Sequence, residues 1–205
     1  MKILDIDTWN RKQHFEHFNA FHDPYFGVSF KVDVTDAYIF SKDHEISFFS
    51  KYLHACMKAI NDIENLKYRI EKDNIVIYDI IHASAAILRP DHTFGLTFIP
   101  FDDDVFIFND NVKKEKDRVL SSTDFFPPVN SNDCIHCSSI PWVNFTGHKE
   151  PYMGVKDSVP KLAFSQVETI NQNKQMTVAI NVNHALADGY HVGLFKERFQ
   201  FYLNA

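Results

Sequence analysis

The chain has 205 residues, of which 45% are hydrophobic and 15% aromatic, and its formal net charge is −6. A chain of this length can bury a substantial core, and we expect a single domain over residues 1–205. The acidic balance excludes the broad basic surface that binds nucleic acid. The N-terminus lacks the apolar segment of a secretory signal, and no apolar run approaches the ~20 residues that span a bilayer. The sequence therefore predicts a soluble, cytoplasmic protein with no membrane partner.

Two helices are predicted in the first third of the chain. The first covers about Thr8 to Phe18, with Thr8 as its cap and Trp9, Phe15 and Phe18 at near-helical spacing. The second runs from about His44 to Asn61. Its apolar residues follow the i, i+3, i+4, i+7 pattern of an amphipathic helix, and they are Ile46, Phe49, Leu53, Cys56, Met57 and Ile60.

Strand patterns fill much of the rest. Residues 68–70 and 75–80 flank Glu71-Lys72-Asp73-Asn74, whose composition suits a hairpin turn. Charge-rich residues 110–118 and 168–175 are predicted to be solvated loops or helix faces, and residues 191–203 a final amphipathic helix. Further strands are predicted over 82–88, 94–101, 134–140, 161–168 and 177–183. These elements predict an α/β fold of the α+β type, a two-layer sandwich in which helices cover a large, mostly antiparallel mixed sheet.

Cysteine usage gives little chemistry. The chain has three cysteines, which are few and odd in number, so they do not indicate a disulfide framework. Cys134 and Cys137 form a C-x-x-C pair around His136, but Cys56 is the only other thiol, whereas a structural zinc site needs four ligands. We interpret them as buried strand cysteines, with metal or redox chemistry as the lesser alternative, and expect no metal.

The segment NHALADGYH, residues 183–191, lies between a predicted strand and the final helix. Read locally, Asp188 caps the helix, Gly189 supplies an unusual backbone angle in the turn and His184 is a packed residue at the end of a strand. The same H-x-x-x-D-G pattern is shared by a wider acyltransferase superfamily. Three other segments accompany it in register: WNRKQHFEHF at 9–18, YRIEKDNIVIYD at 68–79 and SSIPWVNFT at 138–146. Together the four segments closely resemble the chloramphenicol acetyltransferase family over nearly the whole chain.

The resemblance implies roles for four residues in acetyl transfer from acetyl-coenzyme A to a hydroxyl of chloramphenicol. His184 would be the general base, because imidazole accepts a proton near neutral pH. Ser138 would stabilise the oxyanion, its alternative being an ordinary polar strand residue. Asp188 would form an ion pair with Arg11 that orients the loop carrying His184, the alternative for Arg11 being a solvated charge beside Lys12. The tautomer of His184 stays open.

Family likeness also implies a chloramphenicol acetyltransferase-like homotrimer with active sites between subunits. Phe18, Phe26, Phe94 and Tyr152 are the candidate substrate-binding residues. The sequence departs from the family pattern at residues 147–154, which are shorter and charged, and at Ala163 and Val167, where the family has threonine and tyrosine. Ala187 stands where the family commonly has cysteine. Two alternatives therefore accompany the main hypothesis: the same chemistry on a different small alcohol or amine, and a catalytically degraded homologue that binds ligands without turnover.

Overall fold

The computed structural model describes residues 1–72, 74–152, 154–155 and 157–205. Among the described strands, six form one sheet in the order β2-β9-β8-β7-β5-β6, and three short ones form a second in the order β1-β4-β3. The pairs β5–β7 and β7–β8 are parallel and the other pairs antiparallel, which confirms the predicted mostly antiparallel mixed sheet. The bounds are β1 Lys2–Ile3, β2 Tyr25–Asp33, β3 Tyr68–Glu71, β4 Asn74–Ile77, β5 His82–Leu88, β6 Phe94–Leu96, β7 Cys134–Ile140, β8 Lys161–Ile170 and β9 Asn173–Asn183.

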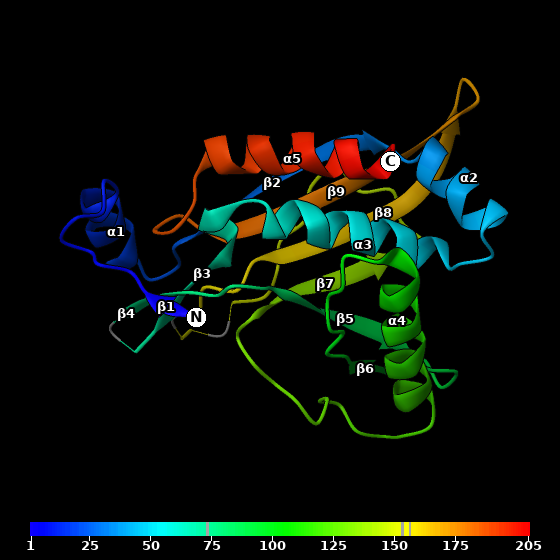
Figure 1. Cartoon of the computed structure of the whole chain (residues 1–205), viewed down its shortest axis with the longest axis horizontal. Coiled ribbons are helices and arrows are strands. Elements are labelled where there is room, and N and C mark those ends of the chain that lie inside the picture. The colour runs from blue at the N-terminus through cyan, green and yellow to red at the C-terminus, as the bar shows by residue number, and fades with distance from the viewer. Residues whose placement is uncertain (73, 153, 156) are drawn as a thin grey trace.

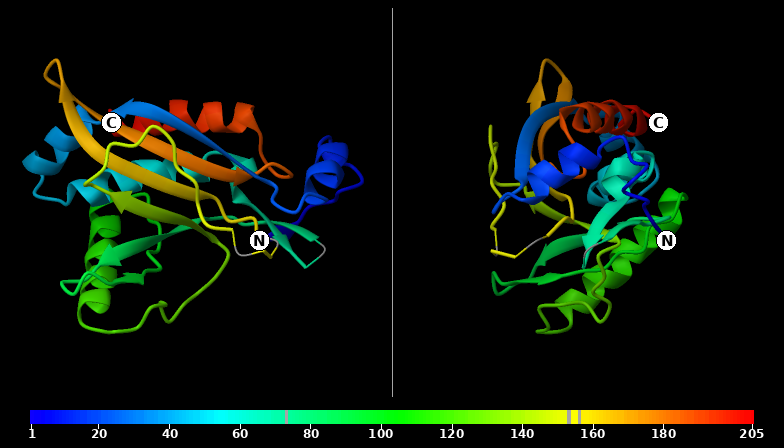
Figure 2. Two further views of the ribbon diagram at one scale, coloured as in Figure 1. Left: turned by 180° about the vertical axis from the view of Figure 1, so that it is seen from behind. Right: turned by 90° about the vertical axis from the view of Figure 1, so that its left-hand side faces the viewer.

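Helices cover one face of the large sheet (Figure 1), and the chain that follows β7 runs over the opposite face (Figure 2). The helices are α1 Lys12–Asn19, α2 Thr35–Asp43, α3 Phe48–Asn61, α4 Val105–Leu120 and α5 Gly189–Leu203, with a short 3₁₀ helix over Glu64–Lys67. The core lies between α3, α5 and the sheet. Its fully buried side chains include Leu53, Met57, Ile60, Val178, Ile180, Phe195 and Phe199.

Two helix starts differ from the predicted ones. The Thr8 hydroxyl donates to the Asp5 carbonyl within a preceding turn, so it does not cap a helix, and α1 begins at Lys12. The helix predicted from His44 begins at Phe48, because Glu45 adopts a φ of 54° and separates α2 from α3. A left-handed residue of this kind cannot continue an α-helix.

The strand predictions are confirmed with some changes of length: β5 and β7 match their predicted bounds, β3, β8 and β9 are longer, and β4 and β6 are shorter. The segment predicted as a strand over 94–101 pairs as β6 over its first three residues and then touches β5 through a single bridge at Ile99. Residues 110–118 lie on α4, and residues 168–175 close the β8–β9 hairpin. The elements β1, β2, α2 and the 3₁₀ helix were not predicted, and α4 was anticipated only as a possible helix face over residues 110–118. Asp73, in the predicted hairpin turn, lies outside the described residues. In the described part of the chain, no helix has the length and hydropathy required to cross a membrane.

One buried cation joins the two sheets. Arg69 of β3 is fully buried and donates hydrogen bonds to the backbone carbonyls of Leu66, Tyr68, Asn132 and Cys134 at 2.6–3.0 Å. Burial lowers the pKa of Arg69 to about 10, which leaves the guanidinium charged at neutral pH. The small sheet is therefore fastened to the beginning of β7.

We predict that Arg69→Met destabilises the protein by roughly 3 kcal/mol, because four buried or partly buried carbonyls lose their donor. Urea denaturation followed by circular dichroism measures the change. Arg198→Met is the matched control, since Arg198 is 57% exposed and its carboxylate partner Asp62 lies 3.9 Å away. Equal unfolding midpoints for the two variants would contradict this role of Arg69.

Candidate active site

His184 lies directly after β9, and two aromatic rings hold its side chain. Phe18 of α1 stacks on the imidazole with ring centroids 3.9 Å apart and planes 4° from parallel. Phe26 of β2 packs against it at 4.5 Å. The His184 backbone N–H donates to the Pro24 carbonyl at 2.9 Å. The imidazole is half-buried, and its Nδ1 atom is buried without a hydrogen-bond partner among the described residues. Its orientation therefore depends on packing.

The turn after His184 is held by Asn183, the last residue of β9. Its side-chain oxygen accepts from the Ala185 N–H at 2.9 Å, and its side-chain nitrogen donates to the Asp157 carbonyl at 3.0 Å. Its own carbonyl accepts from the N–H groups of Leu186 and Ala187. Residues 185–187 are buried. The backbone that presents His184 is thus fixed from both sides.

Asp188 both caps α5 and forms an ion pair with Arg11. One carboxylate oxygen accepts from the Tyr190 N–H at 3.0 Å and caps α5, while the other accepts from Arg11 Nη1 at 2.5 Å. The two side chains are 30% and 13% exposed. Partial burial would raise the pKa of Asp188, but the hydrogen bond from Arg11 and the charges of His191 and Arg11 outweigh it and lower that pKa. The expected ion pair thus links the N-terminal segment to the His184 loop.

Ser138 lies on β7 in the wall of a cavity of about 390 Å³. Phe94 and Leu96 of β6 line this cavity, as does Trp142 from the segment after β7. Ser138 is half-buried and lies beside Ala163 of β8 in the strand register. The residue that replaces the family threonine is therefore next to the candidate oxyanion donor, and it brings no hydroxyl there.

A single chain does not bring His184 and Ser138 together. The register places Ser138, Ala163 and Ala179 in one row across β7, β8 and β9. His184 lies five residues beyond Ala179 along the chain. Five residues at about 3.3 Å and two strand spacings of about 4.8 Å give roughly 19 Å between the backbones of Ser138 and His184. Neither side chain can span that distance to act on one atom.

The candidate substrate-binding aromatics divide in the same way. Phe18 and Phe26 contact His184, whereas Phe94 lines the Ser138 cavity. Tyr152 donates a hydrogen bond to the His22 carbonyl and packs edge-on against the His22 ring, beside the segment that leads into β2. Met153, within the divergent segment 147–154, lies outside the described residues.

Four further polar residues that line the Ser138 cavity were not named as site residues from the sequence: Ser84, His136, Ser139 and Glu150. Desolvation by the surrounding protein lowers the pKa of His136. The alternation of β7 offered a signal for His136, because residues two apart on a strand share a face with Ser138. Glu150 comes from an irregular segment, and its signal was the charged departure of residues 147–154 from the family pattern.

The cysteines behave as the interpretation of buried strand residues predicts. Cys134 and Cys137 are free and buried, and burial raises the pKa of the Cys134 thiol to about 12. Within the described ranges, no group of three His, Cys, Asp or Glu side chains is arranged to hold a metal ion.

Comparison with known proteins identifies the family and agrees with the fold. A family model described as chloramphenicol acetyltransferase matches residues 1–200. Chloramphenicol acetyltransferase 3 of Escherichia coli is 24% identical over 205 residues, covering 98% of this chain and 96% of that protein. The chloramphenicol acetyltransferase of Streptomyces acrimycini is 24% identical over 96% of this chain and 91% of its own length. A solved structure described as chloramphenicol acetyltransferase superposes with a TM-score of 0.89 at 26% identity and covers 98% of this chain and 99% of its own. A dihydrolipoamide acetyltransferase of Azotobacter vinelandii shares the fold, with a TM-score of 0.70 at 12% identity over 94% of this chain and 86% of that one.

We predict that Asp188→Ala destabilises the protein more than Arg11→Met does. Arg11 Nε and Nη2 are buried and have no partner in the part of the chain that is described. Loss of Asp188 would therefore leave the buried Arg11 guanidinium without the partner that its Nη1 now binds. We expect roughly 2–3 kcal/mol, less than the 3–5 kcal/mol of a fully buried pair because Asp188 is partly exposed. Thermal and urea unfolding measure both variants. A smaller loss for Asp188→Ala than for Arg11→Met would contradict this ordering.

The same pair predicts a pH dependence. The folded-state pKa of Asp188 lies below the unfolded value, so its stabilising contribution is present above about pH 4 and is lost as pH falls through the folded pKa. The stability difference between wild type and Asp188→Asn should therefore shrink as the pH falls below about 4. Urea unfolding at several pH values measures it. A difference that grows as the pH falls below about 4 would refute the assignment.

Proposed function

The chain belongs to the chloramphenicol acetyltransferase family of acyltransferases, and on that premise we propose that it transfers an acetyl group from acetyl-coenzyme A to a hydroxyl of chloramphenicol. The observation that carries the proposal is the pair of half-sites. One half presents His184 between Phe18 and Phe26. The other presents Ser138 in a largely apolar cavity with Phe94 and Trp142, where an aromatic acceptor can be buried.

In the proposed reaction, the acceptor oxygen attacks the thioester carbonyl carbon while His184 removes the hydroxyl proton. Since Nδ1 is buried, the base acts through Nε2. The carbonyl oxygen becomes an oxyanion that accepts a hydrogen bond from the Ser138 hydroxyl. Collapse of the tetrahedral intermediate breaks the carbon–sulfur bond, and the imidazolium returns the proton to the departing thiolate. The Arg11–Asp188 pair takes no part in the proton transfer and keeps the His184 turn in place.

The roughly 19 Å between the half-sites supports a symmetric oligomer in which His184 of one subunit faces the Ser138 cavity of its neighbour. The trimer expected from family likeness satisfies this requirement with three equivalent sites. Each subunit then supplies the base to one site and the acceptor cavity to another.

A second candidate function keeps the chemistry and changes the acceptor to another small alcohol or amine. The observation that favours it is the polar part of the cavity wall. Glu150 is half-buried there, and His136 lies on the same strand face as Ser138. A carboxylate at this position favours an acceptor that carries a hydrogen-bond donor or a positive charge.

We predict that purified protein releases coenzyme A thiol from acetyl-coenzyme A only when chloramphenicol is present, and that His184→Ala abolishes this release while leaving the fold intact. A thiol-reactive dye measures the release, and circular dichroism checks the fold. His44→Ala is the control histidine, because His44 is exposed and lies between α2 and α3, away from the proposed site. More than a few per cent residual activity in His184→Ala would contradict the mechanism, whereas a wild type inactive toward chloramphenicol would redirect the search to other acceptors.

Mixing variants tests the placement of the half-sites on different subunits. His184→Ala and Ser138→Ala are each expected to lose at least ~10² in rate. Unfolded together at equal concentration and refolded, they should recover about one quarter of wild-type activity, because a site needs His184 from one variant and Ser138 from the other, each present with probability one half. Refolding each variant alone is the control. No recovery in mixed oligomers would place both residues of a site on one subunit.

A further inference from the structure

Strand β6 is the edge of the large sheet among the described strands, and it has only three residues. On one side it pairs with β5, where Leu96 lies opposite Ala86. The backbone groups on its other side would lack partners in an isolated sheet, which is the usual weakness of an edge strand. Three of these groups are the N–H and carbonyl of Leu96 and the N–H of Phe98, which follows the strand.

Each of these outward groups has a hydrogen-bond partner from α4 or the segment that follows it. The Leu96 N–H donates to the Phe125 carbonyl at 2.8 Å. The Leu96 carbonyl accepts from Arg118 Nη2 at 2.7 Å, and the Phe98 N–H donates to Glu115 Oε2 at 2.9 Å. Glu115 and Arg118 therefore replace a neighbouring strand.

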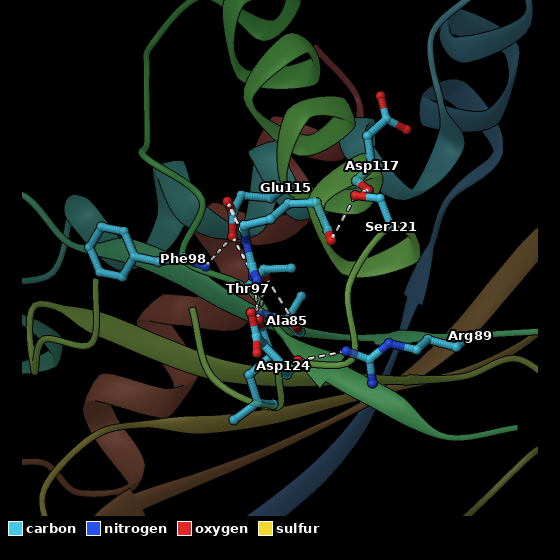
Figure 3. Close-up of polar contacts among 10 residues, drawn as sticks. Ala85, Arg89, Thr97, Phe98, Glu115, Asp117, Ser121 and Asp124 are labelled. Carbon is cyan, nitrogen blue, oxygen red and sulfur yellow. Dashed lines mark hydrogen bonds and ion pairs between the residues drawn. The ribbon is translucent and has the colours of Figure 1, made fainter. Parts of the chain in front are cut away.

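The two side chains also bind each other. Arg118 donates through Nε and Nη2 to the two oxygens of Glu115, both at 3.0 Å, and the side chains are 21% and 14% exposed. A two-pronged charged pair fixes both partners in orientation as well as in distance. Figure 3 shows Glu115 reaching from α4 toward Phe98.

A second arginine lies beside β6. Arg89, which follows β5 and is 8% exposed, donates to the Asp124 carbonyl at 2.6 Å (Figure 3). It also donates to the Val119 carbonyl near the end of α4 at 3.0 Å. It passes so close to Gly95 of β6 that a Cβ atom there would lie 2.7 Å from Arg89 Nη2. Arg89 thus joins the end of β5 to the end of α4 and passes beside β6, while Glu115 and Arg118 bind the end of β6 itself.

From these contacts we propose that Glu115 and Arg118 are positioning residues for acceptor binding: they hold β6 so that Phe94 and Leu96 form the wall of the Ser138 cavity. This inference rests on the proposed function for its substrate. Neither residue touches the reacting atoms. Their effect is on acceptor affinity, while the thioester side of the reaction is unaffected.

The test compares Glu115→Ala, Glu115→Gln and Arg118→Lys with wild type in two measurements. The first is amide hydrogen exchange of residues 94–98, which needs no substrate. The second is KM for chloramphenicol and for acetyl-coenzyme A, determined separately. Asp110→Ala is the matched control, because Asp110 forms an exposed pair with Lys113 on the same helix. Arg118→Lys retains a cation, and Glu115→Gln retains an acceptor for the Phe98 N–H, so at least one variant should fold.

In Glu115→Ala we expect amide exchange at Leu96 and Phe98 to accelerate about tenfold or more and KM for chloramphenicol to rise about tenfold, with KM for acetyl-coenzyme A and exchange in β9 unchanged. Glu115→Gln should fall between this variant and wild type. Unchanged exchange at residues 94–98 would overturn the proposal, as would faster exchange with an unchanged chloramphenicol KM. A wild type that does not acetylate chloramphenicol counts against the proposed function alone. The exchange measurement still tests whether Glu115 and Arg118 hold β6 in place.

Discussion

Strands β7, β8 and β9 share a fixed register that holds Ser138, Ala163 and Ala179 in one row of the sheet. A shift by one residue in any of these strands would turn its buried side chains to the wrong face, so the register cannot adjust to bring distant residues together. His184 follows from the end of β9, and its distance from Ser138 is set when the sheet forms. The organisation of the proposed site as two half-sites is thus a consequence of strand pairing.

The half that carries His184 is assembled from segments far apart in the sequence. Phe18 and Arg11 come from the first residues of the chain, and Phe26 comes from β2. Their partners lie within residues 183–191. Because the imidazole is oriented by ring stacking and its loop by an ion pair, the N-terminal segment contributes to the geometry of the base as much as β9 does.

Sequence reasoning succeeded where a pattern is local. The strand pattern of β7 and β9 and the apolar stripe of α5 are properties of consecutive residues, so these elements were predicted, β7 to both ends and β9 and α5 to their C-terminal ends. The start of α3 depends on the backbone angle of Glu45, which no periodicity reveals. Phe18, Phe26 and Phe94 were assigned by resemblance to one pocket, and the separation of Phe94 from the other two follows from strand order in space, which residue spacing does not contain.

The two halves also differ in how they are supported. His184 continues β9, which is hydrogen-bonded on both sides by β2 and β8. Phe94 and Leu96 belong to a three-residue edge strand that depends on side chains of α4 for its outer hydrogen bonds. Changes near β6 or in residues 147–152 can therefore reshape the acceptor cavity without moving the base. This arrangement explains, in physical terms, how the sequence can keep His184, Ser138, Asp188 and Arg11 while departing from the family pattern around the acceptor.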